Sequence, residues 1–165
     1  MKRLLIAVIL ICSIGNLLAQ EADLTTFILV RHAEKSTDDR EDPNLSEIGF
    51  KRADALKNLL VNADITAIYS TSYKRTIQTV TPIADALNLK IESYNPREKD
   101  FLIEILNSNK GGTVLISGHS NITPLAVNKL LGIEKFEWLK ENEYDKVFVV
   151  SSTGLGKSKV AILTY

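Results

Sequence analysis

Histidine and cysteine, two common nucleophiles in covalent catalysis, are rare in this chain. It has two histidines, His32 and His119, and one cysteine, Cys12. Arg31 precedes the first histidine, and Arg75 lies between the two. Four such basic groups in one place would repel one another unless an anion lay among them. A guanidinium forms paired hydrogen bonds with phosphate oxygens, and nearby arginines keep an imidazole neutral and nucleophilic near pH 7. The residue types therefore predict a phosphate pocket in which a histidine attacks phosphorus and forms a phosphohistidine.

The surrounding elements must bring these side chains together. Short apolar runs bounded by turn residues predict strands at residues 27–30, 65–69, 89–91, 113–117, 146–150 and 159–163. Apolar residues at helical spacing predict helices at residues 46–61, 74–87, 98–106 and 121–131. Strands that alternate with helices predict a three-layer α/β sandwich, with a mainly parallel central sheet flanked by helices. Ligands bind beyond the carboxyl ends of such strands, and His32 and His119 both follow strand ends.

Four short motifs follow one another along the chain. They are Arg31-His32-Ala33-Glu34, Leu45-Ser46-Glu47-Ile48-Gly49, Arg75-Thr76-Ile77-Gln78-Thr79 and Gly118-His119-Ser120-Asn121. In this order they resemble the motifs of the histidine phosphatase superfamily, also called the phosphoglycerate mutase-like family, in its compact phosphatase branch. The usual opening of that family is Arg-His-Gly, so Ala33 is a departure from it. The resemblance covers nearly the whole of residues 20–165.

The resemblance implies a role for each matching side chain. It implies that His32 is the nucleophile and that Ser70 supports the pocket from behind. It implies that the phosphoryl group is bound by Arg31, Arg75, His119, Ser120 and Asn121. It also implies a phosphoglycerate mutase-like fold and a phosphatase that hydrolyses phosphate esters or other phosphoryl compounds.

The proton donor for the leaving group is the least defined part of the pattern. A leaving alcohol needs a general acid unless its own pKa is low. In many relatives a carboxylate between the second motif and the second histidine does this, and here Glu98, Asp100 and Glu104 are the candidates, of which we favour Glu98. The alternative is that Glu98 and Asp100 only complement the dipole of the helix predicted at 98–106. Some compact relatives lack the acid and accept phosphoanhydrides or phosphohistidine, which have better leaving groups.

No metal and no cofactor are expected. The two histidines lie far apart in the sequence, without cysteines or closely spaced carboxylates beside them, which makes a zinc site improbable. The formal net charge is zero, so no basic excess points to nucleic acid. With 45% hydrophobic and 24% charged residues, the composition is that of a globular domain. The expected partner is a small phosphorylated molecule, with a phosphoprotein as the alternative.

The first 19 residues predict a secretory signal peptide. Lys2 and Arg3 precede an apolar run at residues 4–14, and Ala19 precedes the expected cleavage site. The run is shorter than the roughly 20 residues of a membrane-spanning helix, although an uncleaved anchor remains the alternative. Cleavage would remove Cys12 and leave 18 basic and 20 acidic side chains, a net charge of about −2. We therefore expect a catalytic domain at 20–165, periplasmic or secreted, without disulfides and off the membrane.

Three alternatives to a general phosphatase fit parts of the sequence. A phosphoglycerate mutase would carry a longer insertion after the second motif, whereas Arg75 and His119 are only 44 positions apart. A non-catalytic module that binds phosphorylated ligands would need arginines but not two histidines. A phosphohistidine protein phosphatase suits the compact size, but such proteins work in the cytoplasm, and the predicted signal peptide argues against one. An uncleaved anchor with the domain inside the cell would favour this last alternative.

Overall fold

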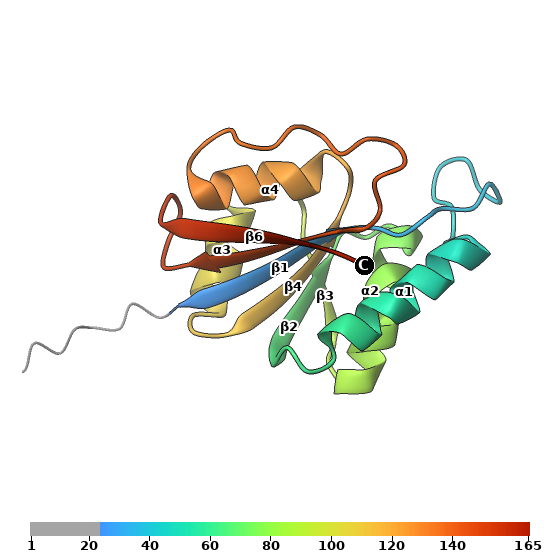
Figure 1. Cartoon of the computed structure of the whole chain (residues 1–165), viewed down its shortest axis with the longest axis horizontal. Helices are drawn as coiled ribbons and strands as arrows, with labels where there is room; N and C mark the ends of the chain where they lie inside the picture. The colour runs from blue at the N-terminus through green and yellow to red at the C-terminus, as the bar shows by residue number, and fades with distance from the viewer. Residues whose placement is uncertain (1–23) are drawn as a thin grey trace, which may run out of the picture.

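A six-stranded sheet with helices on both faces forms the described part of the chain, residues 24–165 of the computed structural model (Figure 1). The predicted signal peptide, residues 1–19, lies outside the described residues. No helix within 24–165 is long and apolar enough to cross a membrane. In chain order the elements are β1 (Thr25–Arg31), α1 (Glu47–Leu60), β2 (Ile65–Ser70), α2 (Lys74–Leu87), β3 (Ile91–Ser93), α3 (Phe101–Ser108), β4 (Thr113–Gly118), α4 (Ile122–Leu131), β5 (Lys146–Ser152) and β6 (Ser158–Thr164).

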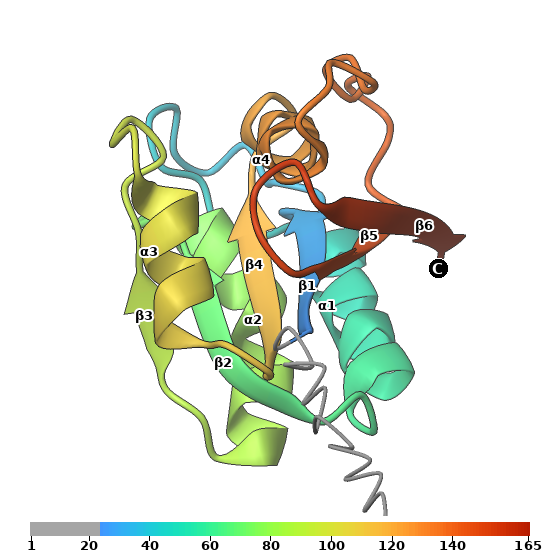
Figure 2. The ribbon, with the colours of Figure 1, turned by 90° about the vertical axis from the view of Figure 1, so that its left-hand side faces the viewer.

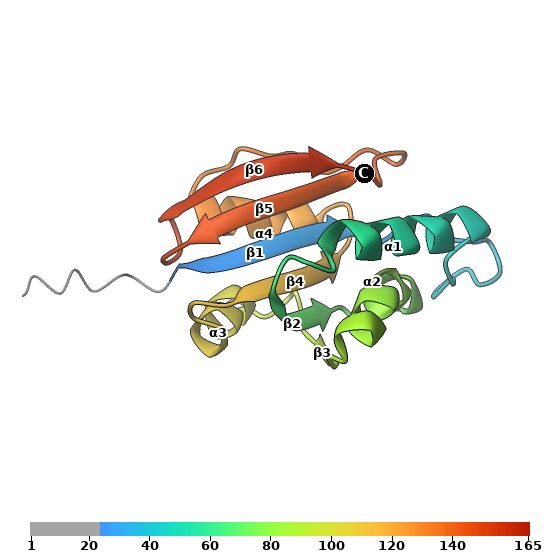
Figure 3. The same cartoon turned by 60° about the horizontal axis from the view of Figure 1, so that its bottom comes forward.

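The strand order of the sheet is β3-β2-β4-β1-β5-β6. The first four strands in this order are parallel to one another, and β5 and β6 add an antiparallel hairpin at the edge beside β1 (Figure 3). The predicted three-layer α/β sandwich with a mainly parallel sheet is therefore confirmed.

Strand β1 lies inside the sheet and is buried on both faces, which explains why its sequence is a continuous apolar run. Phe27 and Leu29 belong to the core cluster that contains α3 and α4. Ile28 and Val30 point the other way, into the cluster that contains α1 and α2. Figure 2 shows β1 and β4 side by side at the centre of the sheet, between these two pairs of helices. The two cores hold both central strands rigidly, so their carboxyl ends form a fixed platform.

Helix α1 starts where the sequence predicted, at an N-cap formed by Ser46. The Ser46 side chain accepts a hydrogen bond from the Gly49 backbone N–H at 3.1 Å, and the Ser46 N–H donates to the Glu34 carbonyl at 2.8 Å. The first turn thereby rests on the backbone that follows β1. A Cβ atom at position 49 would overlap the Glu34 carbonyl oxygen, so only glycine allows this approach.

Helix α3 begins at Phe101, three residues later than the predicted start at Glu98. The Asn95 side chain organises the preceding segment as a turn, because its Oδ1 accepts from the Arg97 N–H at 3.1 Å and its Nδ2 donates to Glu98 at 3.2 Å. Phe101 is the first residue of this stretch that reaches the core. The prediction that Glu98 lies in the first helical turn is therefore wrong, because Glu98 stands two residues before the N-cap residue Asp100.

Strand β3 also begins later than predicted, at Ile91 rather than Leu89. Helix α2 ends at Asn88, which adopts a left-handed conformation with a φ of 53°. The Leu89 N–H then bonds back to the Ala84 carbonyl at 2.9 Å. Leu89 is thus used to close the helix, and strand pairing with β2 starts at Ile91.

The contact between Gly49 and the loop after His32 leads to a prediction. An alanine in a helix interior is ordinarily about 1 kcal/mol more favourable than glycine. Gly49→Ala should instead destabilise the protein by about 1–3 kcal/mol, because the added methyl group displaces the Glu34 backbone. Urea denaturation measures this, with Asn58→Ala on the exposed side of the same helix as the control. A Gly49→Ala protein as stable as the wild type would show that the two segments do not press on one another.

Candidate active site

Three strand ends meet at one edge of the sheet. Arg31, the last residue of β1, pairs with Gly118 of β4, and Ser70 of β2 pairs with Ser117. The next residue of each strand therefore enters the same space, and the His32 N–H donates to the Gly118 carbonyl at 2.9 Å. The ring centroids of His32 and His119 are 5.5 Å apart, at an interplanar angle of 69°. The structure thus brings the two predicted histidines together.

The proton of the His32 ring is placed by the backbone. Its Nδ1 lies 2.7 Å from the Ala33 carbonyl oxygen. A carbonyl can only accept, so Nδ1 carries the hydrogen and Nε2 keeps its lone pair. Burial, together with the positive field of the neighbouring basic side chains, lowers the pKa of His32 to about 3, against the opposing effect of its bond to Ala33. His32 is therefore a neutral imidazole near pH 7, with the electronic state that a nucleophile needs.

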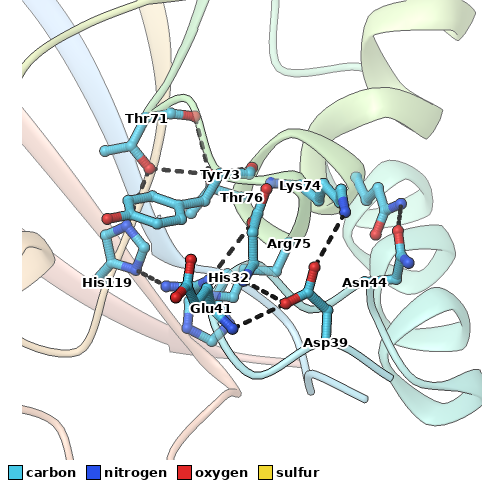
Figure 4. A network of polar contacts seen from close by, with 12 residues as sticks. His32, Asp39, Glu41, Asn44, Thr71, Tyr73, Lys74, Arg75, Thr76 and His119 are labelled. Carbon is cyan, nitrogen blue, oxygen red and sulfur yellow. Dashed lines mark hydrogen bonds and ion pairs between the residues drawn. The ribbon is translucent and has the colours of Figure 1, made fainter. Parts of the chain in front are cut away.

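The ring of His119 lies between two partners on opposite sides (Figure 4). Its Nε2 is 3.0 Å from Thr71 Oγ1, and its Nδ1 is 3.4 Å from Arg75 Nη2. The ring of Tyr73 stands perpendicular to it, with centroids 5.1 Å apart. Burial is the main cause that lowers the pKa of His119 to about 4, and the charges of Arg75 and Arg31 add to it. His119 is also neutral near pH 7 when the pocket holds no anion.

Arg75 stands in the first turn of α2, where a loop residue completes the helix end. Tyr73, at the N-cap position of α2, makes no capping hydrogen bond with its side chain. Asp42 takes that role, since its Oδ1 accepts from the Lys74 N–H at 2.9 Å. The same carboxylate lies 3.8 Å from Arg75 Nη1, and the guanidinium packs on the Tyr73 ring at 4.5 Å. Arg75 is thus held between Asp42 and His119.

Arg31 does more in the structure than the sequence suggested. Its Nη1 donates to three backbone carbonyls of the loop between α4 and β5, those of Lys140, Glu141 and Glu143, at 2.7, 3.2 and 3.1 Å. Its guanidinium also lies 4.1 Å from the centre of the Tyr144 ring. Within the described residues its buried Nε–H has no hydrogen-bond partner. Arg31 therefore anchors the 140–143 loop.

A cleft of about 1020 Å³ opens beside these side chains. Its lining includes all the predicted site residues, namely Arg31, His32, Arg75, Glu98, His119, Ser120 and Asn121. Of the other two candidate acids, Glu104 lines the cleft, whereas Asp100 does not. Asp100 lies at the N-cap position of α3 and makes no capping bond with its side chain. In the stretch 24–165 no three His, Cys, Asp or Glu side chains are grouped so that they could hold a metal ion.

Ser70 and Thr71 lie behind the pocket and contact it in different ways. The Ser70 hydroxyl donates to the Thr71 carbonyl at 2.8 Å, so it steadies the backbone of its neighbour. It is Thr71 whose side chain reaches His119. Thr71 follows the end of β2 just as His32 follows β1, so the strand-end argument applied to polar residues would have found it. No sequence signal points to Asp42 or Tyr144, which arrive from loops.

Comparison with known proteins finds a family match over part of the chain. Residues 27–97 match the histidine phosphatase superfamily, branch 1. The chain is 38% identical over 88 residues to phosphoserine phosphatase 1 of Hydrogenobacter thermophilus, a match that covers 50% of this chain but only 39% of that enzyme.

Two solved structures show the same fold at low sequence identity. A mycobacterial glucosyl-3-phosphoglycerate phosphatase aligns with a TM-score of 0.68 and 12% identity, covering 86% of this chain and 98% of its own. The protein histidine phosphatase SixA, complexed with tungstate, aligns with a TM-score of 0.66 and 18% identity, covering 84% and 96%.

The two buried histidines lead to a prediction about acid stability. Each has an ordinary pKa of 6.5, lowered to about 3 for His32 and about 4 for His119 in the folded protein. As the pH falls from 6.5 towards 4, the two histidines bind protons in the unfolded chain but stay neutral in the folded protein. The free energy of unfolding should therefore fall by up to about 1.4 kcal/mol per pH unit for each histidine.

Urea denaturation between pH 4 and pH 7 measures this slope. A variant that carries both His32→Gln and His119→Gln should lose stability less steeply over the same window, because the carboxylates common to both proteins contribute equally. Parallel slopes in the two proteins would mean that the histidines titrate normally in the folded state.

Proposed function

Because residues 27–97 match the histidine phosphatase superfamily, branch 1, we propose that the chain is a metal-independent phosphatase of this family that acts through a covalent phosphohistidine on His32. The observation that carries this proposal is the electronic state of His32. The ring is buried and neutral, its Nδ1 hydrogen is tied to the Ala33 carbonyl, and its Nε2 lone pair is left for attack. A module that only bound phosphate would not require this arrangement.

The proposed reaction has two steps. In the first, Nε2 of His32 forms a bond to phosphorus while the bond between phosphorus and the leaving oxygen breaks, and a general acid protonates that oxygen. In the second, water attacks phosphorus and gives a proton to the general acid that was deprotonated in the first step, the bond to Nε2 breaks, and inorganic phosphate leaves. Throughout both steps, the Ala33 carbonyl accepts a hydrogen bond from the Nδ1–H of His32 and stabilises the positive charge on the phosphorylated ring.

The charge of the transferring group would be met by side chains already in place. Arg31, Arg75 and His119 line the cleft next to His32. Fixed donors of this kind stabilise the equatorial oxygens of a transferring phosphoryl group without reorganising. A bound dianion would also raise the pKa of His119, so that this ring takes up a proton and donates to the phosphoryl group.

Glu98 is our proposal for the general acid. It lines the same cleft as the histidines, and Asn95 steadies its carboxylate through a hydrogen bond of 3.2 Å. It stands in an irregular turn ahead of α3, so it is not one of the acidic residues of the first helical turn. Glu104 also lines the cleft and serves as the comparison in the experiment below.

A small phosphorylated molecule is the proposed substrate. The cleft, about 1020 Å³, is far larger than one phosphoryl group and has charged side chains such as Lys35 and Arg97 along it. Glutamates line the same cleft, among them Glu92 and Glu141, and Glu141 lies 4.0 Å from Lys35. Side chains of both signs suit a substrate that carries a carboxylate and an ammonium group besides its phosphate, such as the phosphoserine named for the relative from Hydrogenobacter thermophilus. The resemblance in fold to a protein histidine phosphatase makes a phosphoprotein the second substrate to test.

We also propose that the domain is exported from the cytoplasm. The support is the signal-peptide pattern of Lys2 and Arg3, the apolar run at residues 4–14 and the small residue Ala19. Mass spectrometry of the protein from separated cell fractions tests it. A mature chain beginning near residue 20 outside the cytoplasm is expected, and an intact N-terminus inside the cell would contradict it.

The central prediction concerns His32. The purified protein should hydrolyse para-nitrophenyl phosphate in the presence of EDTA, and His32→Ala should lower kcat by at least about 1000-fold, as loss of a nucleophile does. Asn58 is exposed on α1 and does not line the cleft, so Asn58→Ala should keep full activity. Absence of turnover by folded wild-type protein between pH 5 and pH 8, or inhibition by EDTA, would refute a metal-independent phosphomonoesterase.

Substrates with poor and good leaving groups distinguish a general acid at Glu98 from a residue that only shapes the cleft. Glu98→Gln should lower kcat for phosphoserine, whose alcohol is a poor leaving group, by about 100-fold. It should change turnover of para-nitrophenyl phosphate only slightly, because that phenol leaves without protonation. Glu104→Gln is the matched control and should keep the ratio of the two rates. Equal losses on both substrates would mean that Glu98 is not the acid.

A further inference from the structure

The hydrogen-bond partners of His119 determine where its proton lies. Its Nδ1 faces Arg75 Nη2 at 3.4 Å, and a guanidinium offers donors but no acceptor. Nδ1 is therefore the acceptor of that contact and carries no hydrogen. A neutral imidazole has one N–H, so it must be on Nε2, which then donates to Thr71 Oγ1 at 3.0 Å.

The hydroxyl of Thr71 is itself directed by a second threonine. Thr71 Oγ1 and Thr76 Oγ1 are 2.9 Å apart, and both side chains are buried. Thr76 Oγ1 has two backbone carbonyls within reach, that of Tyr73 at 2.8 Å and that of Thr71 at 2.9 Å. Its hydrogen goes to one of them, so its oxygen accepts from Thr71. The single hydrogen of Thr71 is thereby used, and its free lone pair faces His119.

These contacts form one chain with a single direction, from His119 through Thr71 and Thr76 to the backbone (Figure 4). We propose that Thr71 is a positioning residue that fixes the tautomer and the orientation of His119. Its hydroxyl holds the hydrogen on Nε2 and so makes Nδ1 the nitrogen that is presented, beside Arg75, to a bound phosphoryl group.

The catalytic consequence of this arrangement rests on the proposed phosphatase function. When an anion enters the pocket, Nδ1 is the only nitrogen of His119 that can take up a proton. The resulting imidazolium donates from both nitrogens, to Thr71 on one side and to the phosphoryl group on the other. Without the hydroxyl, the Nε2–H would be buried without an acceptor, and the ring would shift its hydrogen to Nδ1 or turn away from Arg75.

Nitrogen NMR of the purified protein with nitrogen-15 in its histidine rings tests the tautomer directly. The chain has only two histidines, and the structure assigns them opposite tautomers, Nδ1–H for His32 and Nε2–H for His119. The wild-type spectrum near pH 7 should show one ring of each kind. Two rings with the hydrogen on Nδ1 would overturn the proposal without recourse to any variant.

Two substitutions and a control complete the test. Thr71→Val removes the hydroxyl at nearly constant shape and should abolish the pure Nε2–H pattern of His119, whereas Thr71→Ser should keep it. Thr81→Val removes a hydroxyl that bonds to the Ile77 carbonyl within α2 and should leave the spectrum unchanged. An unchanged His119 tautomer in folded Thr71→Val would overturn the proposal, and if that variant does not fold, the wild-type and Thr71→Ser spectra decide.

Kinetics supply the second readout. Thr71→Val should lower kcat for para-nitrophenyl phosphate about tenfold, with a smaller change in KM, because a hydrogen bond to the charged ring is lost in the transition state. Thr71→Ser should restore kcat. Equal activity of Thr71→Val and wild type would overturn the catalytic consequence. An inactive wild type would instead refute the proposed function, while the spectra would still decide the tautomer.

Discussion

Parallel pairing of β4 with both β1 and β2 is the constraint on which the site depends. It sets three strand ends level at one edge of the sheet, with Arg31 beside Gly118 and Ser70 beside Ser117. The residues that follow these ends, His32, Thr71 and His119, therefore lie close together. Burial on both faces then prevents the strands from sliding, because a shift by one residue would turn Phe27 and Leu29 into the opposite core.

Placing four basic side chains at one edge creates an electrostatic problem, and the fold solves it with backbone groups. Burial keeps both histidines uncharged, which removes two of the four positive charges. The charge on Arg31 is met by three carbonyl oxygens, and that on Arg75 by Asp42 and the face of Tyr73. The folded protein thus accommodates these basic side chains, and the pocket remains electropositive enough to attract an anion.

Sequence reasoning succeeded where the signal is local and periodic. The helix at 74–87 was predicted to the residue, since its apolar face ends at Asn88, which closes it. The histidines were found because they follow apolar strands. The start of α3 was missed because the Asn95 side chain organises a turn that apolar spacing does not reveal. The hydrogen bonds from Arg31 to residues 140–143 join positions more than 100 apart in the sequence. Their acceptors are backbone carbonyls, which every residue has, so no sequence pattern predicts them.

Those carbonyl contacts have a consequence for how the sequence of this protein can diverge. Arg31 recognises the path of the main chain between α4 and β5 and not the identity of its side chains. Residues 140–142 can therefore change in type as long as their backbone course is preserved, whereas Glu143 helps to hold that course, because its carboxylate accepts from the Lys140 N–H at 2.8 Å. An insertion or deletion there would draw the guanidinium out of place. Variation in what the cleft accepts should accordingly arise by substitution in this loop, and variation in loop length should be confined to segments that do not touch Arg31.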